Sequence, residues 1–371
     1  MGVIRRLTVI SAAAALAFVL NMAPTGAVSG DGRLSTGCRD SAHQVHQLVI
    51  RVNGEPAQGI YSLPARKPRG LVVFAHGYGH TTDSWEHHAI EASRHGLIAV
   101  AMNYRGLTIL PDSDGDGLRN SRGWPAMAGA EDSIAAARLF EAVCRPPTVT
   151  IFGVSMGGNM SGLAVAIAGE EGITRADGKT PLFDYWIDVE GVANLTETYS
   201  EARLIAPANA FARQAQQDIE AETGGPIEQR PQAFQERTVV SRVDDVADAI
   251  RGAVVIHGLD DGLVPYNQGR EMASALRGAG VDTDMITVGL KDEDSERETT
   301  LTGYAGSAID PQYRSPVAGH ASEKSTTHIV METAFERLWS LVEGRTPGPY
   351  RECLANGLVP AMLRTVCLPS F

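Results

Sequence analysis

A short glycine-flanked segment is the first place in the sequence where residue types and spacing predict catalysis. It reads Gly153-Val154-Ser155-Met156-Gly157 and directly follows the apolar run 149–152. A serine on a sharp turn between a strand and a helix needs small neighbours, and glycines occupy both second positions around Ser155. Such a turn exposes the hydroxyl at the carboxyl edge of a sheet, beside a helix N-terminus that favours negative charge. Ser155 is therefore the candidate nucleophile, although the pattern alone is weak in a chain with 39 glycines.

A serine hydroxyl is a poor nucleophile unless a base accepts its proton and an acid orients that base. The apolar run 254–256 leads into a loop that would lie at the same edge of the sheet as Ser155. This loop reads His257-Gly258-Leu259-Asp260-Asp261-Gly262-Leu263-Val264-Pro265. We predict that Asp261 is the orienting acid and keep Asp260 as the alternative. An Asx turn is the purely structural explanation for either residue.

Two histidines follow this acid loop in the chain, and the order serine, acid, histidine requires the base to be one of them. His320 lies in Val317-Ala318-Gly319-His320-Ala321, which we expect to be a loop before the last helix. His328 lies within that expected helix, where a packing or surface role is more common. We therefore predict His320 as the base and keep His328 as the alternative.

The loop after the apolar run 71–75 is the candidate oxyanion-binding loop. It reads His76-Gly77-Tyr78-Gly79-His80, and its glycines allow backbone amides to approach a substrate closely. We predict that the amides of Tyr78 and Met156 are the two oxyanion donors. A plain tight turn is the alternative interpretation of the loop. His76 is expected to be a structural hydrogen-bonding residue rather than a second base.

A separate acidic segment, residues 111–120, resembles the first half of a calcium-binding loop. Asp112, Asp114 and Asp116 alternate along it, and Gly117 permits a sharp turn. The twelfth position of such a loop is Gly123, where a bidentate glutamate is usual. Two interpretations stay open, a weak structural calcium ion and a solvated acidic turn. Serine chemistry itself requires no cofactor.

Apolar runs alternate with helical stretches along the rest of the chain. The expected strands are 47–52, 59–63, 70–75, 97–102, 148–152, 185–189, 253–256 and 285–288, and the expected helices are 85–95, 128–143, 158–169, 267–277 and 326–343. This order predicts an α/β fold with a mostly parallel sheet flanked by helices. The stretch 195–249 is too long for one connection, so we expect a helical cap insertion there. A polar insertion is expected at 291–317.

The N-terminus predicts export. Arg5 and Arg6 precede the short apolar run 7–20, and small residues end a candidate signal peptide at position 27. The run is too short to span a bilayer core of about 30 Å, which argues against a membrane anchor. We expect an irregular segment at 28–44 and a secreted protein that is not inserted in a membrane.

An even number of cysteines in an exported chain indicates disulfides. Three pairings are open for Cys38, Cys144, Cys353 and Cys367. The preferred pairing closes a short loop between Cys353 and Cys367 and leaves Cys38 with Cys144.

The chain has 44 acidic against 32 basic residues, a net charge of −12. Such a surface repels nucleic acid and anionic lipid, so we expect neither as a partner. The serine chemistry instead predicts a small-molecule or peptide acyl substrate.

Together the motifs resemble the α/β-hydrolase superfamily, and within it the branch of prolyl-oligopeptidase-type peptidases, acyl peptidases and related esterases. The resemblance rests on His76-Gly77-Tyr78-Gly79, Asn103-Tyr104-Arg105-Gly106, Gly153-Val154-Ser155-Met156-Gly157-Gly158, His257-Gly258 with Asp261 and Val264-Pro265, and Gly319-His320. It places an α/β-hydrolase domain at 45–347, followed by a C-terminal extension with a disulfide at 348–371. No propeller precedes the catalytic region in this sequence, which weakens an assignment to the oligopeptidases themselves.

The resemblance implies cleavage of an ester or amide through an acyl-enzyme, without a cofactor. The leading hypothesis is a secreted serine hydrolase that cleaves a carboxylic ester of a small or medium acyl substrate. A serine peptidase or amidase is the nearest alternative, and a non-catalytic binding protein with a hydrolase fold is a third. The complete set of Ser155, Asp261 and His320 argues against the third hypothesis.

Overall fold

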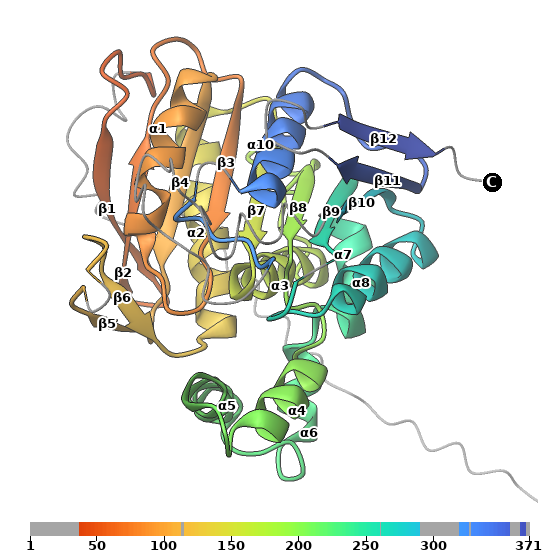
Figure 1. Ribbon diagram of the computed structural model, residues 1–371. Coiled ribbons are helices and arrows are strands. Elements are labelled where there is room, and N and C mark those ends of the chain that lie inside the picture. Colours follow the sequence, from red (N-terminus) through yellow and green to blue (C-terminus); the bar gives the residue numbers. More distant parts are fainter. Residues whose placement is uncertain are drawn as a thin grey trace, which may run out of the picture.

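The computed structural model describes residues 37–112, 115–259, 261–289, 319–325, 328–356 and 364–368. The expected signal peptide, the polar insertion at 291–317, Asp114 and the alternative acid Asp260 lie outside these residues. In the described ranges a central sheet crosses the molecule and carries helices on both faces (Figure 1). The α/β-hydrolase fold class predicted from the sequence is confirmed.

The sheet has ten strands in the order β1-β2-β4-β3-β7-β8-β9-β10-β11-β12. Their bounds are β1 Val45–Val52, β2 Glu55–Ser62, β3 Gly70–Ala75, β4 Leu97–Asn103, β7 Val149–Val154, β8 Tyr185–Val189, β9 Gly252–Gly258, β10 Asp282–Gly289, β11 Arg351–Asn356 and β12 Arg364–Leu368. Neighbours from β4 to β11 pair in parallel, whereas β2 is antiparallel to β1 and β4, and β12 is antiparallel to β11. The parallel centre places the carboxyl ends of β3, β7, β8 and β9 at one edge, where the site residues follow them.

Helices on the two faces account for the apolar runs of the central strands. The helices are α1 Glu86–Arg94, α2 Ala126–Cys144, α3 Met156–Glu170, α8 Tyr266–Gly278 and α10 Ile329–Val342. One apolar core lies under α1 and α10, and the other lies under α2, α3 and α8. Strand β3 shows the alternation, since Val72 and Phe74 enter the first core and Val73 enters the second.

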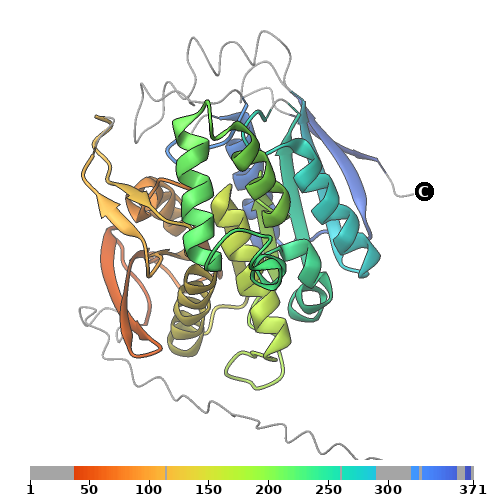
Figure 2. The same cartoon turned by 90° about the horizontal axis from the view of Figure 1, so that it is seen from below.

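The predicted cap is a group of short helices that stands away from the sheet (Figures 1 and 2). It comprises α4 Leu195–Ile205, α5 Ala210–Thr223 and α6 Pro231–Glu236, followed by a 3-10 turn at Val239–Arg242. Asn194 and Asn209 cap α4 and α5 through their side-chain oxygens.

Helix α7, Val243–Ala249, also falls in the predicted insertion but packs on the main domain. A Cβ added at Gly169 of α3 would lie 1.9 Å from the carbonyl oxygen of Asp245 in α7. The two backbones therefore touch, so α7 is part of the main domain rather than of the cap.

The C-terminal extension adds β11 and β12 to the sheet, which the sequence analysis did not predict. Cys353 and Cys367 face each other across these two strands and form a disulfide. A second disulfide joins Cys38, just before β1, to Cys144 at the end of α2. This is the pairing that the sequence favoured.

A two-stranded ribbon of β5 Thr108–Leu110 and β6 Asn120–Arg122 brackets the acidic segment. None of the helices in the described ranges is both long enough and apolar enough to cross a membrane.

Candidate active site

Ser155 lies on the turn between β7 and α3, in a backbone conformation that side chains rarely adopt. Its φ and ψ are 58° and −124°. The flanking glycines make this turn possible, because a Cβ at Gly157 would lie 2.1 Å from the carbonyl oxygen of Ala75. The Ser155 amide donates to the carbonyl of Val189 at the end of β8 (3.0 Å). The sequence therefore holds the serine rigidly at the carboxyl edge of the sheet.

Asp261 and His320, the predicted acid and base, form a direct hydrogen bond. The distance from His320 Nδ1 to Asp261 Oδ2 is 2.8 Å. The other oxygen, Oδ1, accepts the amides of Leu263 and Val264 at 2.8 and 3.0 Å, which fixes the carboxylate against the ring. Burial opposes ionisation, but His320 and the neighbouring His257 hold the pKa of Asp261 well below its usual range.

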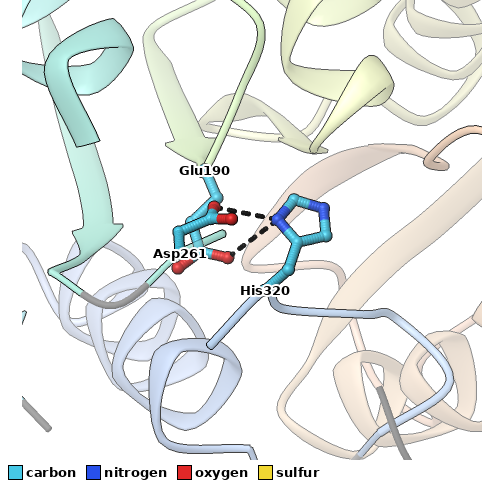
Figure 3. Close-up of side chains that lie close together, drawn as sticks. All are labelled: Glu190, Asp261 and His320. Carbon is cyan, nitrogen blue, oxygen red and sulfur yellow. Dashed lines mark hydrogen bonds and ion pairs between the residues drawn. The ribbon is translucent and has the colours of Figure 1, made fainter. Parts of the chain in front are cut away.

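A second carboxyl group, Glu190, reaches the same imidazole (Figure 3). Its Oε2 lies 3.4 Å from His320 Nδ1 and accepts the amide of Ala321 at 2.5 Å, and its Oε1 accepts the amide of Gly258 at 2.9 Å. The sequence analysis missed Glu190. The available signal was its place directly after β8, since the end of that strand lies between the ends of β7 and β9.

Glu190 and Asp261 are buried side by side and differ in their affinity for a proton. Burial and the charge of Asp261 raise the pKa of Glu190 well above its usual range. Ligand atoms of Glu190, Asp261 and His320 all lie within 4.8 Å of one another, so this is the group of described residues best placed to hold a metal. The hydrogen bonds named above already engage those atoms within the protein.

The predicted oxyanion loop runs directly against the nucleophile. A Cβ added at Gly77 would lie 3.4 Å from the Cβ of Ser155. In the described part of the chain the amide of Tyr78 donates to no acceptor, and the amide of Met156 opens α3, where helical amides lack intrahelical partners. Both predicted donors are therefore available to a substrate.

The side chain of Tyr78 ties this loop to the cap. Its hydroxyl donates to Asp218 of α5, and its ring packs against Trp124 and Phe211. Asp218 also accepts the amide of Gly123 (3.2 Å). The cap therefore contacts the loop that would bind the oxyanion.

Glu323 is a second residue that the sequence analysis missed. Its Oε1 accepts the amide of Gly77 (2.7 Å). The same oxygen lies 2.8 Å from His80 Nδ1, which is within ion-pair distance, although the angle does not suit a hydrogen bond. Burial opposes ionisation, but the facing His80 holds the pKa of Glu323 down at about 2. No pattern in the sequence indicates that this glutamate turns inward.

His76 behaves as the structural residue that the sequence predicted. Its Nδ1 lies 3.0 Å from the carbonyl oxygen of Gly77, and its ring stacks on Tyr104. Burial lowers the pKa of His76 to about 4, so the ring is neutral at physiological pH.

The alternative base, His328, is at the N-cap of α10 rather than inside the helix. Its ring accepts the amide of Val330. Its position does not line the pocket that contains Ser155 and His320.

That pocket has a volume of about 190 Å³. Among the described residues its lining comprises Gly77, Tyr78, Gly79, His80, Asn120, Ser155, Phe211, Leu263, His320, Ala321, Ser322, Glu323 and Lys324. The set combines residues from four loops with Asn120 of β6 and Phe211 of the cap, and Phe211 and Leu263 are its large aliphatic or phenyl side chains.

The acidic segment proposed for calcium has protein partners. Asp112 accepts the amides of Gly115 and Gly117 at 2.7 and 2.9 Å, and Asp116 forms a buried ion pair with Lys324. An ammonium group on Asp116 counts against a cation there, so the described residues fit calcium poorly. Calcium binding stays a prediction, which calorimetry on EDTA-treated protein tests; no heat on adding calcium would contradict it.

Comparison with protein families gives one match. The model of the prolyl oligopeptidase family matches residues 83–292. No curated protein sequence matches the chain.

Solved structures similar to the chain include a puromycin-hydrolysing peptidase of Mycobacterium tuberculosis (20% identity, TM-score 0.47) and an acylaminoacyl peptidase of Pyrococcus horikoshii (14%, 0.47). Each covers 67% of this chain, and the chain spans 36% of each. An esterase of Pyrobaculum calidifontis is 18% identical, with 69% of this chain and 79% of that one covered and a TM-score of 0.45.

The family match covers more than half of the sequence and includes the turn of Ser155 and the loop of Asp261. The chain belongs to the prolyl oligopeptidase family of the α/β-hydrolase superfamily and is a serine hydrolase.

Proposed function

We propose that this protein is a secreted enzyme that cleaves a carboxylic ester of a small or medium acyl substrate through an acyl-enzyme on Ser155. The observation that carries the proposal is the 2.8 Å bond between His320 Nδ1 and Asp261, in a pocket shared with a strained Ser155. This bond favours the tautomer with the hydrogen on Nδ1, so that Nε2 is the ring nitrogen that would accept the serine proton.

In the proposed reaction His320 removes the Ser155 proton as Oγ attacks the acyl carbon. The amides of Tyr78 and Met156 bind the developing oxyanion. His320 then protonates the leaving group as the bond to it breaks, which leaves the acyl group on Ser155. Water, deprotonated by His320, attacks the acyl-enzyme; the bond from the acyl carbon to Oγ breaks, His320 returns the proton to Ser155, and the acid is released.

The size of the pocket supports a small acyl group. Pockets that hold drug-sized ligands have volumes of about 300–1,000 Å³, and this pocket, with about 190 Å³, is smaller. Phe211 gives it one apolar wall.

A serine peptidase is the second candidate, and the family match favours it. Ester and amide cleavage use the same triad and oxyanion hole, so the two candidates differ in the leaving group rather than in the machinery.

A fluorophosphonate probe tests the serine chemistry. We expect labelling of the wild type, loss of labelling in Ser155→Ala, and no change in Ser200→Ala, an exposed serine of α4 that serves as the control. An unlabelled wild type would instead favour a binding protein. Hydrolysis of p-nitrophenyl esters of graded chain length, compared with peptide anilides, then separates esterase from peptidase.

Export is also part of the proposal. Two disulfides suit an oxidising compartment. N-terminal sequencing of the protein from the culture medium should find residue 28 at or near the start, and retention of residues 1–27 would contradict the signal peptide.

A further inference from the structure

Glu190 lies where the three loops of the proposed triad meet. The carbonyl of the preceding Val189 accepts the amide of Ser155. The two oxygens of Glu190 accept the amides of Gly258, three residues before Asp261, and Ala321, one residue after His320. Two adjacent residues at the end of β8, Val189 and Glu190, thus contact the nucleophile turn, the acid loop and the base loop.

The backbone of Glu190 is strained, and its side chain is fully buried. Its φ is 47°, a left-handed conformation that is uncommon for a glutamate. Its amide donates to the carbonyl of Ile256 on β9 (2.8 Å), which anchors the conformation. Strain of this kind persists where surrounding contacts enforce it, and it clusters at functional sites.

Two carboxyl groups face one ring nitrogen of His320. Asp261 Oδ2 is 2.8 Å from Nδ1 and Glu190 Oε2 is 3.4 Å from it. The one hydrogen on Nδ1 is donated to the closer oxygen, Asp261 Oδ2. Two carboxylates this close share one negative charge, because like charges in a buried site disfavour double ionisation. Asp261 carries that charge, since two backbone amides and two imidazoles face it.

This inference rests on the proposed function. We propose that Glu190 is a positioning residue that can also replace Asp261 as the acid that orients His320, a role called the reserve acid below. While Asp261 is charged, Glu190 keeps its proton and holds the loop of His320 through the amide of Ala321. When Asp261 is replaced by a neutral residue, Glu190 releases its proton to solvent, and its Oε2 accepts the Nδ1 hydrogen of His320.

A double-mutant cycle of Asp261→Asn and Glu190→Gln tests this role. An acid-to-amide change costs about 10⁴-fold in kcat in a triad with a single orienting acid. We expect Asp261→Asn here to lose only about 10²-fold, because Glu190 takes over. Glu190→Gln alone should lower kcat about fivefold with little change in KM, since glutamine can accept only one of the two amides. The double variant should lose about 10⁴-fold relative to the wild type.

A reserve acid is recognised by how the effect of Glu190→Gln on kcat depends on the background. The loss in kcat should be about fivefold in the wild-type background and about 10²-fold in the Asp261→Asn background. The same factor in both backgrounds would mean that Glu190 is only structural, and would overturn the proposal. Glu236→Gln on α6, an exposed glutamate of the cap, is the matched control and should have no effect in either background.

Proton NMR gives a readout that needs neither turnover nor a known substrate. An imidazole Nδ1 hydrogen bonded to a carboxylate resonates far downfield. We expect this signal in wild type and in Asp261→Asn, and its loss in the folded double variant, with folding checked by thermal denaturation. Absence of the signal in folded Asp261→Asn would overturn the reserve role. A wild type that shows the signal but neither labels nor hydrolyses would overturn the proposed function alone.

Discussion

Glu190 and Glu323 are two buried glutamates of one site with opposite proton affinities. Both have almost no exposed surface, and both accept backbone amides. Glu190 holds the loop that carries His320, and Glu323 holds the oxyanion loop. The pKa of Glu190 is raised well above the usual range, and the pKa of Glu323 is lowered to about 2.

The difference comes from the groups that face them. Burial raises the pKa of any carboxyl group, so it acts in the same direction on both. Glu190 faces the negative Asp261, whereas Glu323 faces His80. The group of Glu190, Asp261 and His320 thus carries one carboxylate charge, on Asp261, whereas the oxyanion loop is held by the ionised carboxylate of Glu323. Burial sets the cost of a charge, and the facing group decides whether the charge is present.

Asp188, a third buried carboxyl group, sharpens the comparison because one of its oxygens has no partner among the described residues. Burial alone raises its pKa from 3.8 to about 7. The folded state therefore keeps the proton that the unfolded state loses above pH 4, and the contribution of Asp188 to stability falls as the pH rises from about 4 to about 7. At about 1.4 kcal/mol per pH unit, the loss is about 4 kcal/mol.

We expect Asp188→Asn to remove this loss. Its stability relative to the wild type should rise by about 4 kcal/mol between pH 4 and pH 8, as measured by urea denaturation at each pH. Asp245→Asn, at a half-exposed position, should show no such trend. A pH-independent difference for Asp188→Asn would mean that burial does not govern this carboxyl group.

Glu323→Gln and Glu190→Gln should change the pH dependence of stability with opposite signs. Ionised Glu323 stabilises the folded state above pH 4.5, and this contribution of about 3 kcal/mol is lost as the pH falls towards 2. Glu323→Gln should therefore become less stable relative to wild type as the pH rises from 2 to 5. Glu190 keeps its proton in the folded state, so Glu190→Gln should gain relative stability as the pH rises above 4.

Urea titrations of the two variants and the wild type between pH 2 and pH 8 measure these slopes. The comparison uses differences between variants at each pH, because other titrating groups contribute equally to all three proteins. Slopes of the same sign would show that the facing groups, Asp261 and His80, do not determine the two charges.

Glu323→Ala should lower kcat by about 10²-fold with little change in KM. Its Oε1 holds the amide of Gly77, and release of that peptide loosens the Tyr78 amide that we propose as an oxyanion donor. Loss of one donor costs about 10²- to 10³-fold in comparable sites. Glu323→Gln retains an oxygen for Gly77 and should lose much less. Equal losses in the two variants would assign the effect to charge rather than to position.

The same comparison explains what the sequence could predict. Ser155, Asp261 and His320 could be predicted as a group because each follows a recognisable apolar run or precedes a helix, and parallel strands bring their carboxyl ends to one edge. The fold class followed from the alternation of strands and helices.

Glu190 and Glu323 were missed because their roles depend on which strands are neighbours and on where a side chain turns. Strand β8 pairs with both β7 and β9, which no local pattern reveals. The pairing of β11 with β10 is likewise a long-range contact, and α7 looks like a cap helix until its packing on α3 is known. Ion pairs such as Asp116 with Lys324 join segments that are 208 residues apart.

The smallest expected effect concerns another contact of the oxyanion loop, the bond from the Tyr78 hydroxyl to Asp218 of the cap. Tyr78→Phe keeps the ring packed on Trp124 and Phe211 and removes only this bond. Because the backbone amide rather than the hydroxyl is the proposed donor, kcat/KM should fall only about fivefold, equivalent to about 1 kcal/mol. Asp218→Asn should have a similar effect, and the double variant should be no worse than either single one. Additive losses measured with a p-nitrophenyl ester would mean that the two side chains act separately rather than through their shared hydrogen bond.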